Sequence, residues 1–380
     1  MSWLLLGAIL PSLIVSAAAA ALVRRYAPRW GLVDRPGHRK VHSTPTPLGG
    51  GLAIWVGIAL PLAAGHLLLA SATKIAPGEY ALPGGWSLPP MVAEHLGGLN
   101  QQAPRLWFLL CCGAALVALG LVDDFRGLHW LLRMAAQTAI AALVVGWWPG
   151  WRLSLFLQPL WLTLLLSVFW IVGLVNSFNM LDNMDGLSAG VAAIASAMLA
   201  AVLLTTPSPI THQPQLFVAG FLLVLVGSLL GFLWHNRPPA RLFMGDAGSY
   251  LIGFCLATAT SMATFTGGDL PPHTILAPLC ILAVPLYDTV TVVWIRVRQG
   301  RSPFEGDKSH FSHRLVEMGM TRGQAVLTIY LTTATCGLGG LLLHQVDEQG
   351  AWIVILLVIC VLTLIAILET AGRKGPRNGL

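Results

Sequence analysis

The feature that most limits what this chain can fold into is a series of long apolar runs that recurs from one end to the other. A helix of about 20 apolar residues crosses the hydrocarbon core of a bilayer, and these runs are close to that length. Charged residues make up 10% of the chain, whereas soluble domains carry about 25%. The sequence therefore excludes a water-soluble globule and predicts an all-α, polytopic integral membrane helix bundle.

We expect about eleven transmembrane helices, which leave no room for a sizeable soluble domain. Residues 1–380 are therefore predicted to form a single polytopic membrane domain. The expected segments are 3–23, 48–70, 105–122, 129–148, 159–178, 187–205, 215–234, 247–265, 273–295, 324–343 and 351–369.

The first apolar run differs from a secretory signal peptide in the position of its positive charges. A signal peptide carries them before its apolar stretch, whereas here they follow it, in RRYAPR at 24–29. We expect this run to be retained as a first helix with its N-terminus outside.

Positive charge predicts which loops face the cytoplasm. If the segments alternate in direction and Arg133, one turn inside the fourth segment, is included, one side holds all but three of the 22 Lys and Arg residues, the exceptions being Lys74, Arg105 and Arg152. The positive-inside rule makes that side cytoplasmic. The net charge of +6 is then mostly an asymmetry across the membrane and does not indicate nucleic-acid binding. The cytoplasmic parts are 24–47, 123–128, 179–186, 235–246, 296–323 and the tail 371–380.

Carboxylates gather on the same side of the membrane. The external loops also carry acids, but these are scattered without a pattern. We therefore expect the functional site at the cytoplasmic face. The clustered acids are Asp123, Asp124, Asp182, Asp185, Asp246 and Asp307.

The motif GLVDDFRGL (120–128) places Asp123 and Asp124 side by side at the end of a predicted helix. Adjacent carboxylates repel each other unless a cation or a divalent metal lies between them. A solvated helix end is the alternative, but a helix C-terminus disfavours acids. The pair therefore indicates a functional role.

The motif NSFNMLDNMDG (176–186) spaces four polar side chains three residues apart, which keeps them roughly on one helix face. These side chains supply hard oxygen ligands suited to Mg²⁺ that bridges to substrate phosphates. An amphipathic helix end at the membrane interface is the competing interpretation. The four residues are Asn176, Asn179, Asp182 and Asp185.

The motif RLFMGDAGSYLIG (241–253) sets Asp246 between two glycines at the start of an apolar helix. Helix N-termini bind phosphate, and Asp246 could hold a metal there or serve simply as an N-cap. Phe243 could stack on a base or pack at the interface.

The motif GDKSHFSHRL (306–315) offers His310, His313 and Arg314 as donors for a diphosphate. A zinc site is the less favoured alternative, because no Cys lies nearby. The loop DRPGHRKVHSTPTPLGGG (34–51) adds His42 as a candidate substrate contact, and its triple Gly allows close backbone approach.

Asp288 lies inside the apolar run 273–295. An ionisable residue within a membrane segment indicates function by default. A structural role, capping or bracing the cytoplasmic vestibule, is favoured over a catalytic one.

Four of these motifs, in this order, resemble those of the polyprenyl-phosphate N-acetylhexosamine-1-phosphate transferases, glycosyltransferase family 4, to which phospho-MurNAc-pentapeptide transferase is related. The resemblance covers about residues 24–323. It implies a bundle of ten or eleven transmembrane helices, which the count of eleven fits. It also implies transfer of a sugar-1-phosphate from a UDP-sugar to undecaprenyl phosphate, with release of UMP, at the cytoplasmic face of a bacterial inner membrane.

The resemblance implies roles for the motif residues. Asp123 and Asp124 would position or deprotonate the lipid phosphate, and Asp182 and Asp185 match the acids of the central motif. Asp246 and Asn179 would bind Mg²⁺, for which Mn²⁺ is a possible substitute. The expected substrate-binding residues are Arg133, Asn176, Phe243, His310, His313, Arg314 and His42.

Two positions depart from the family pattern. Ser312 stands where a histidine is common, which weakens any catalytic claim for that position. Arg133 stands where a Lys is common, and it keeps the charge while gaining bidentate phosphate geometry.

Three alternatives stay open. DNMDG and the absence of three consecutive histidines favour UDP-GlcNAc as donor over the pentapeptide donor of peptidoglycan synthesis. A membrane transporter is the rival of another class, although its coupling site would lie near the membrane midplane, where this chain is nearly uncharged. A homodimer is an option for the assembly.

Overall fold

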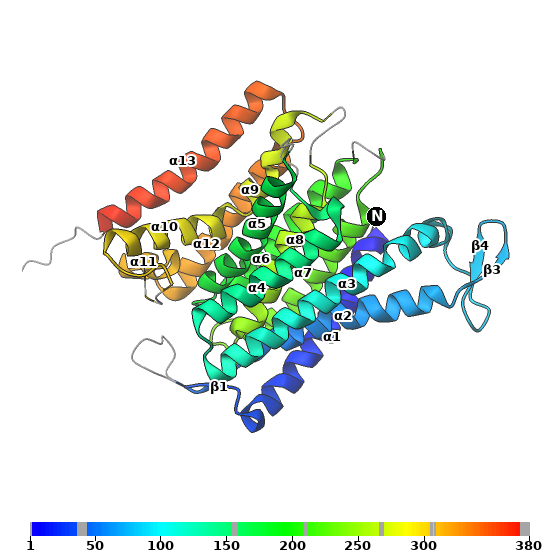
Figure 1. Ribbon diagram of the computed structural model, residues 1–380, viewed down its shortest axis with the longest axis horizontal. Helices are drawn as coiled ribbons and strands as arrows, with labels where there is room; N and C mark the ends of the chain where they lie inside the picture. Colours follow the sequence, from blue (N-terminus) through cyan, green and yellow to red (C-terminus); the bar gives the residue numbers. More distant parts are fainter. Residues whose placement is uncertain are drawn as a thin grey trace, which may run out of the picture.

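The computed structural model is a bundle of long helices (Figure 1) and describes residues 2–35, 44–153, 159–208, 212–265, 270–304, 307 and 309–372. The helices α4 to α8 lie at its centre, with α1 to α3 on one side and α10 to α13 on the other. The first eight helices are α1 (Ser2–Tyr26), α2 (Gly50–Ala70), α3 (Pro90–Arg126), α4 (Trp130–Trp147), α5 (Leu160–Leu181), α6 (Leu187–Thr205), α7 (Leu216–Asn236) and α8 (Gly245–Met262). The last five are α9 (Ala277–Ile281), α10 (Ala283–Arg298), α11 (Phe311–Glu317), α12 (Arg322–Leu342) and α13 (Glu348–Gly372).

Short elements connect the helices. Two antiparallel ribbons are present, one of β1 (Val33–Asp34) with β2 (Thr46–Pro47) and one of β3 (Thr73–Ala76) with β4 (Glu79–Ala81). Three 3₁₀ turns, η1 (Ala27–Trp30), η2 (Pro149–Trp151) and η3 (Pro272–Leu276), complete the described elements.

The prediction of a polytopic helical membrane protein is confirmed. Within the described ranges, nine helices are long and apolar enough to cross a membrane, and a bent pair would make ten. The remaining predicted segment is α8, which is buried along most of its length and packs against α2, α3, α5, α6 and α7. Because α8 faces protein rather than lipid, its surface need not be strongly apolar. The count of eleven spans stays a prediction.

The sequence predicts one helix over 273–295, and this is wrong. The chain bends by 69° between Pro272–Ile281 and Ala283–Arg298. A proline has no N–H to donate, and its ring clashes with the carbonyl four residues earlier. Pro285 therefore disfavours a continuous helix through residue 281, and α10 begins after the break at Leu282.

The segment 71–104, which the sequence predicts to be an external loop, is more ordered than the sequence indicates. It begins with the ribbon of β3 and β4 and then enters α3 at Pro90, fifteen residues before the predicted start of that segment. The short helix α11 inside the loop 296–323 is a further element that the hydropathy pattern does not predict.

Glycines allow three helices to meet at the level of their backbones. A Cβ on Gly51 would lie 2.2 Å from the Gly248 nitrogen, and one on Gly120 would lie 2.3 Å from the Ala247 backbone. The Gly50 and Gly51 N–H groups donate to the Phe243 and Met244 carbonyls at 2.9 and 3.0 Å. The triple glycine thus gives the close backbone approach expected of it, and α2 and α3 fix the start of α8.

We expect Gly120→Ala to destabilise the protein by about 1–3 kcal/mol, the usual cost of inserting atoms into a packed interior. The added methyl group meets backbone atoms of α8, which cannot rotate away as a side chain could. The measurement is the thermal unfolding midpoint of the detergent-purified protein.

The matched control is Gly97→Ala in the same helix, where a Cβ would meet nothing within 4 Å. Its unfolding midpoint should stay unchanged or rise slightly, since Ala favours a helix more than Gly. Equal midpoints for the two variants would contradict the packing argument.

Candidate active site

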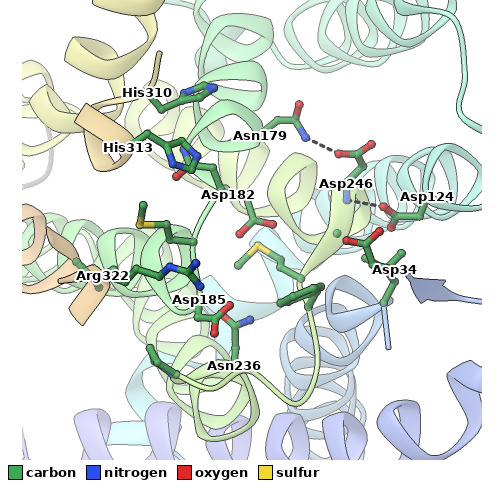
Figure 2. A pocket seen from close by; sticks show the side chains of 18 of the residues that line it. Asp34, Asp124, Asn179, Asp182, Asp185, Asn236, Asp246, His310, His313 and Arg322 are labelled. Carbon is green, nitrogen blue, oxygen red and sulfur yellow. Dashed lines mark hydrogen bonds between the residues drawn. The ribbon is translucent and has the colours of Figure 1, made fainter. Parts of the chain in front are cut away.

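A cavity of about 590 Å³ lies where the ends of several helices meet. It brings together side chains from the last turns of α3, α5 and α7, from the first turns of α8 and α12, and from α11 (Figure 2). Eight of the predicted site residues line it, namely Asp124, Asn179, Asp182, Asp185, Phe243, Asp246, His310 and His313.

Asp124 joins the end of α3 to the start of α8. Its carboxylate accepts hydrogen bonds from the backbone N–H of Asp246 at 2.9 Å and of Ala247 at 3.5 Å. These are the free N–H groups that the sequence offers to a phosphate. In the structure they donate to Asp124 instead. The acid at the C-terminus of α3 therefore occupies the position at the N-terminus of α8 where an anion is stabilised.

Asp123 is not among the residues that line the cavity and is 5% exposed. It accepts hydrogen bonds from the Leu128 N–H at 2.7 Å, the Tyr250 hydroxyl at 2.8 Å and the Arg133 guanidinium at 3.0 Å. This arrangement rules out the solvated helix end. Asp123 is held by three donors and orients Arg133, whose Nη1 lies 3.9 Å from an Asp246 oxygen.

The two predicted metal ligands lie in contact. The Asn179 side-chain amide lies 2.6 Å from Oδ1 of Asp246 and 3.1 Å from the Ser249 hydroxyl. The N-cap position of α8 is Met244 rather than Asp246. The simple N-cap interpretation of Asp246 is therefore wrong, and its carboxylate is available to the cavity.

Asp182 and Asp185 differ in how they are held. The Asp185 carboxylate accepts from the Ala240 N–H at 2.9 Å, whereas no residue in the described ranges donates a hydrogen bond to the Asp182 carboxylate. Burial, together with the charges of Asp124 and Asp185, raises the pKa of Asp182 to about 7. An acid in this state gains from a cation placed beside it.

The basic side chains that line the cavity gather on one side of it, whereas acids lie on both sides, Asp185 being next to Arg322 (Figure 2). In Figure 2, Asp34, Asp124 and Asp246 lie on one side, and His310, His313 and Arg322 lie on the other. Asp182 lies between the two groups. A ligand with several phosphate oxygens could bind the basic side directly and the acidic side through a cation.

The donor set fits Mg²⁺. No group of three or more His, Cys, Asp or Glu in the described part of the chain is arranged to hold a metal by itself. Mg²⁺ commonly uses only one or two carboxylates and completes its shell with waters and substrate phosphates. Asp246, with Asn179 beside it and the unpaired Asp182 across the cavity, matches that pattern.

Two predicted substrate contacts lie elsewhere. Arg314 is buried on α11 and donates to Glu369 of α13 at 3.0 Å and to Thr291 at 3.1 Å. Asn176 donates to the Gln137 side chain of α4 at 2.7 Å. A three-residue step falls short of a full helical turn by about 60°, so Asn176 is rotated away from the face that reaches the cavity.

Arg133 and His42 are the remaining predicted substrate contacts. Arg133 is not among the cavity-lining residues but touches the site through Asp123 and Asp246. His42 lies outside the described residues.

Ser312, the departure from the histidine pattern, is 1% exposed. Its hydroxyl donates to the Asn183 side chain, which lines the cavity. This position therefore supports the cavity wall and does not face a ligand.

Several cavity residues escaped the sequence analysis. Asp34 lines the cavity and opens the loop motif that suggested His42. Tyr250 does not line the cavity but donates to Asp123, and it lies one helical turn after Asp246, so spacing could have pointed to both. Nothing in the local sequence marks Asn236 or Arg322. Asp307 also lines the cavity; its burial favours the protonated form, but hydrogen bonds from Arg296 and Ser309 outweigh this and lower its pKa.

The fold and the cavity define a polytopic membrane protein with a charged site at one end of its helix bundle. A family model of glycosyl transferase family 4 matches residues 106–264, which include Asp123, Asp124, Asn179, Asp182 and Asp246. The chain belongs to this family, as its curated relatives also indicate.

Three of these relatives span most of the chain. A probable undecaprenyl-phosphate N-acetylglucosaminyl 1-phosphate transferase of Bacillus subtilis is 28% identical, covering 97% of this chain and 93% of its own. A decaprenyl-phosphate N-acetylglucosaminephosphotransferase of Mycolicibacterium smegmatis is 31% identical, covering 97% and 88%. An undecaprenyl-phosphate alpha-N-acetylglucosaminyl 1-phosphate transferase of Escherichia coli K12 is 26% identical, covering 88% and 82%.

We expect the affinity of the purified protein for Mn²⁺ to weaken by up to about tenfold per pH unit as the pH falls below 7, because the metal must displace a proton. The pKa of Asp182, about 7, places the onset of this effect near neutral pH. Titration of Mn²⁺ at a series of pH values measures it.

In Asp182→Asn the affinity should be lower and less dependent on pH over this range. Glu317→Gln is the matched control, since Glu317 is an exposed acid outside the cavity. A pH dependence that is equally steep in Asp182→Asn would exclude Asp182 as its source.

Proposed function

We propose that this protein transfers GlcNAc-1-phosphate from UDP-GlcNAc to undecaprenyl phosphate and releases UMP. The observation that carries the proposal is the cavity, which joins four separated motifs and combines carboxylates with basic side chains gathered on one side. The names of the three relatives describe GlcNAc-1-phosphate transfer to a polyprenyl phosphate and support the proposed reaction. The product would be the first lipid-linked intermediate of a cell-envelope polysaccharide.

The reaction brings two anions together. An oxygen of the lipid phosphate attacks the sugar-bearing phosphorus of the UDP-sugar, and the bond from that phosphorus to the UMP oxygen breaks. Because both partners are negatively charged, catalysis depends mainly on positioning and on electrostatic stabilisation of the developing charge. The chain offers basic groups for this purpose in His310, His313, Arg322 and Arg133.

The acidic side of the cavity suits a divalent cation. Mg²⁺, when bound by Asp246 with Asn179 and the nearby Asp182, would neutralise diphosphate charge and polarise its oxygens. Asp124 keeps Asp246 in place through the backbone of α8. Phe243 lines the cavity and offers a flat surface for the uracil ring.

The location follows from where the two substrates are found. A UDP-sugar is soluble and cytoplasmic, whereas undecaprenyl phosphate lies in the bilayer, so the site belongs at helix ends on the cytoplasmic face. The cluster of positive residues around the motif-bearing loops supports this orientation. We propose a bacterial inner-membrane protein with eleven spans, an external N-terminus and a cytoplasmic C-terminus.

The protein purified with undecaprenyl phosphate and Mg²⁺ should release UMP from UDP-GlcNAc but not from UDP-MurNAc-pentapeptide. Chromatographic quantification of UMP measures the reaction, and omission of the lipid phosphate is the control. Release of UMP from the pentapeptide donor alone would support the transfer reaction and contradict UDP-GlcNAc as the donor. If neither donor gives UMP, uptake of labelled UDP-GlcNAc into vesicles tests the transporter alternative.

We expect Asp246→Asn to lower the rate of UMP release by at least about a hundredfold, the scale of losing a main electrostatic contact in an active site. The variant should remain folded, because Asn keeps an oxygen that can pair with Asn179. Turnover across a Mg²⁺ titration, together with the thermal unfolding midpoint, measures both effects.

Asp347→Asn is the matched control, since that acid lies outside the cavity and accepts a hydrogen bond only from the Gly350 N–H in the described part of the chain. Near-normal turnover of Asp246→Asn at all Mg²⁺ concentrations would remove Asp246 from the metal site.

A further inference from the structure

The helix α11 is held by an aspartate that lies within the broken span of α10. Asp288 is fully buried, and both of its carboxylate oxygens are engaged. Oδ2 lies 2.9 Å from Nδ1 of His310, and Oδ1 accepts a hydrogen bond of 2.6 Å from the Phe311 N–H. Asp288 therefore satisfies the first backbone donor of α11 and holds the His310 ring at the same time. The contact supports the structural role predicted for Asp288, and the partner of its carboxylate is a histidine.

The contact determines which nitrogen of His310 carries a proton. An ionised carboxylate can only accept hydrogen bonds, so Nδ1 must be the donor to Oδ2. The other nitrogen, Nε2, is then the one left to face a ligand. No residue in the described ranges bonds to Nε2, and His310 lines the cavity on its basic side (Figure 2).

We propose that Asp288 is a positioning residue for the transfer reaction, holding His310 so that Nε2 faces the substrate. In the neutral ring Nε2 accepts a hydrogen bond from a hydroxyl group, and in the protonated ring it donates to a phosphate oxygen. In both states Nδ1 stays bound to Asp288, so the ring does not turn when its charge changes. The inference rests on the proposed function for its activity readout only.

A second buried anchor of α11 provides a matched control. Oε2 of Glu369 accepts hydrogen bonds from Arg314 Nε and from the Tyr287 hydroxyl, both at 3.0 Å. This anchor ties α11 to α13 and does not touch His310. Glu369→Gln keeps an acceptor oxygen while it removes the charge, so it should weaken the docking of α13 and leave the His310 ring unchanged.

Asp288→Asn tests the proposal because an amide has only one acceptor oxygen. If that oxygen accepts the Phe311 N–H, the amide NH₂ faces Nδ1 and forces the proton onto Nε2. We expect the turnover number for UMP release to fall by at least about tenfold, within the range that a misplaced acid–base group costs, with a smaller change in KM. Glu369→Gln should retain most of the turnover.

A double-mutant cycle with His310→Gln separates positioning from simple structural support. If Asp288 acts through His310, adding Asp288→Asn to His310→Gln causes no further loss of turnover. If Asp288 only caps α11, Asp288→Asn lowers turnover by the same factor in the native protein and in His310→Gln, and the proposal is overturned.

The ¹⁵N NMR signals of the histidine rings give a readout that does not need turnover. The His310 signals, assigned by their loss in His310→Gln, should show the Nδ1–H form in the native protein and the Nε2–H form in Asp288→Asn. An unchanged form in the variant overturns the proposal, whereas absence of UMP from the native protein would overturn only the proposed function. Should Asp288→Asn fail to fold, Asp288→Glu replaces it, with the Nδ1–H form retained and turnover reduced because the ring is displaced.

Discussion

The site depends on one interaction, the pair of hydrogen bonds from the Asp246 and Ala247 N–H groups to the Asp124 carboxylate. It joins two helix ends of opposite polarity, so an acid that would destabilise the C-terminus of α3 stabilises the N-terminus of α8. Aspartate has a short side chain, and the two backbones must come close for it to reach. Gly120 allows this approach, and Gly245, whose φ of 73° suits glycine, leaves room where a Cβ would lie 2.4 Å from an Asp124 oxygen.

Two acids of the site show how environment divides their roles. Asp123 accepts three hydrogen bonds and is not among the residues that line the cavity. Asp182 accepts none from the described residues and is held against the charges of Asp124 and Asp185, so burial and repulsion keep its pKa near 7. The first acid is rigid and orients Arg133, whereas the second gains most from a metal or a proton. A cavity that binds an anion and a cation together needs an acid that positions a basic side chain, as Asp123 does, and an acid that faces the cation, as Asp182 does.

The sequence predicted the helical bundle and the meeting of the motifs at one end of it, since the bilayer fixes the length of a span and successive spans alternate in direction. It did not predict which side chains pair. Arg314 carries the charge expected of a phosphate contact, but its partner Glu369 lies 55 residues further along the chain. Asn176 follows the three-residue spacing of its motif and still turns away, because that spacing does not match the helical period. Which side chains pair depends on the rotation of each helix and on residues far apart in the chain, and a short motif contains neither.

Buried acids explain why a polar loop keeps a fixed position at the end of the bundle. The region around α11 is basic, and Phe311 and Leu315 are its apolar side chains that pack into the core. Asp288 and Glu369 lie in spans, where an unpaired carboxylate is costly, and each finds its donors on or beside α11. Satisfying these acids adds to the packing of Phe311 and Leu315 in docking α11 on the bundle, which places His310 and His313 at the cavity. The cost of placing a charge in the membrane thereby determines the geometry of the basic side of the site.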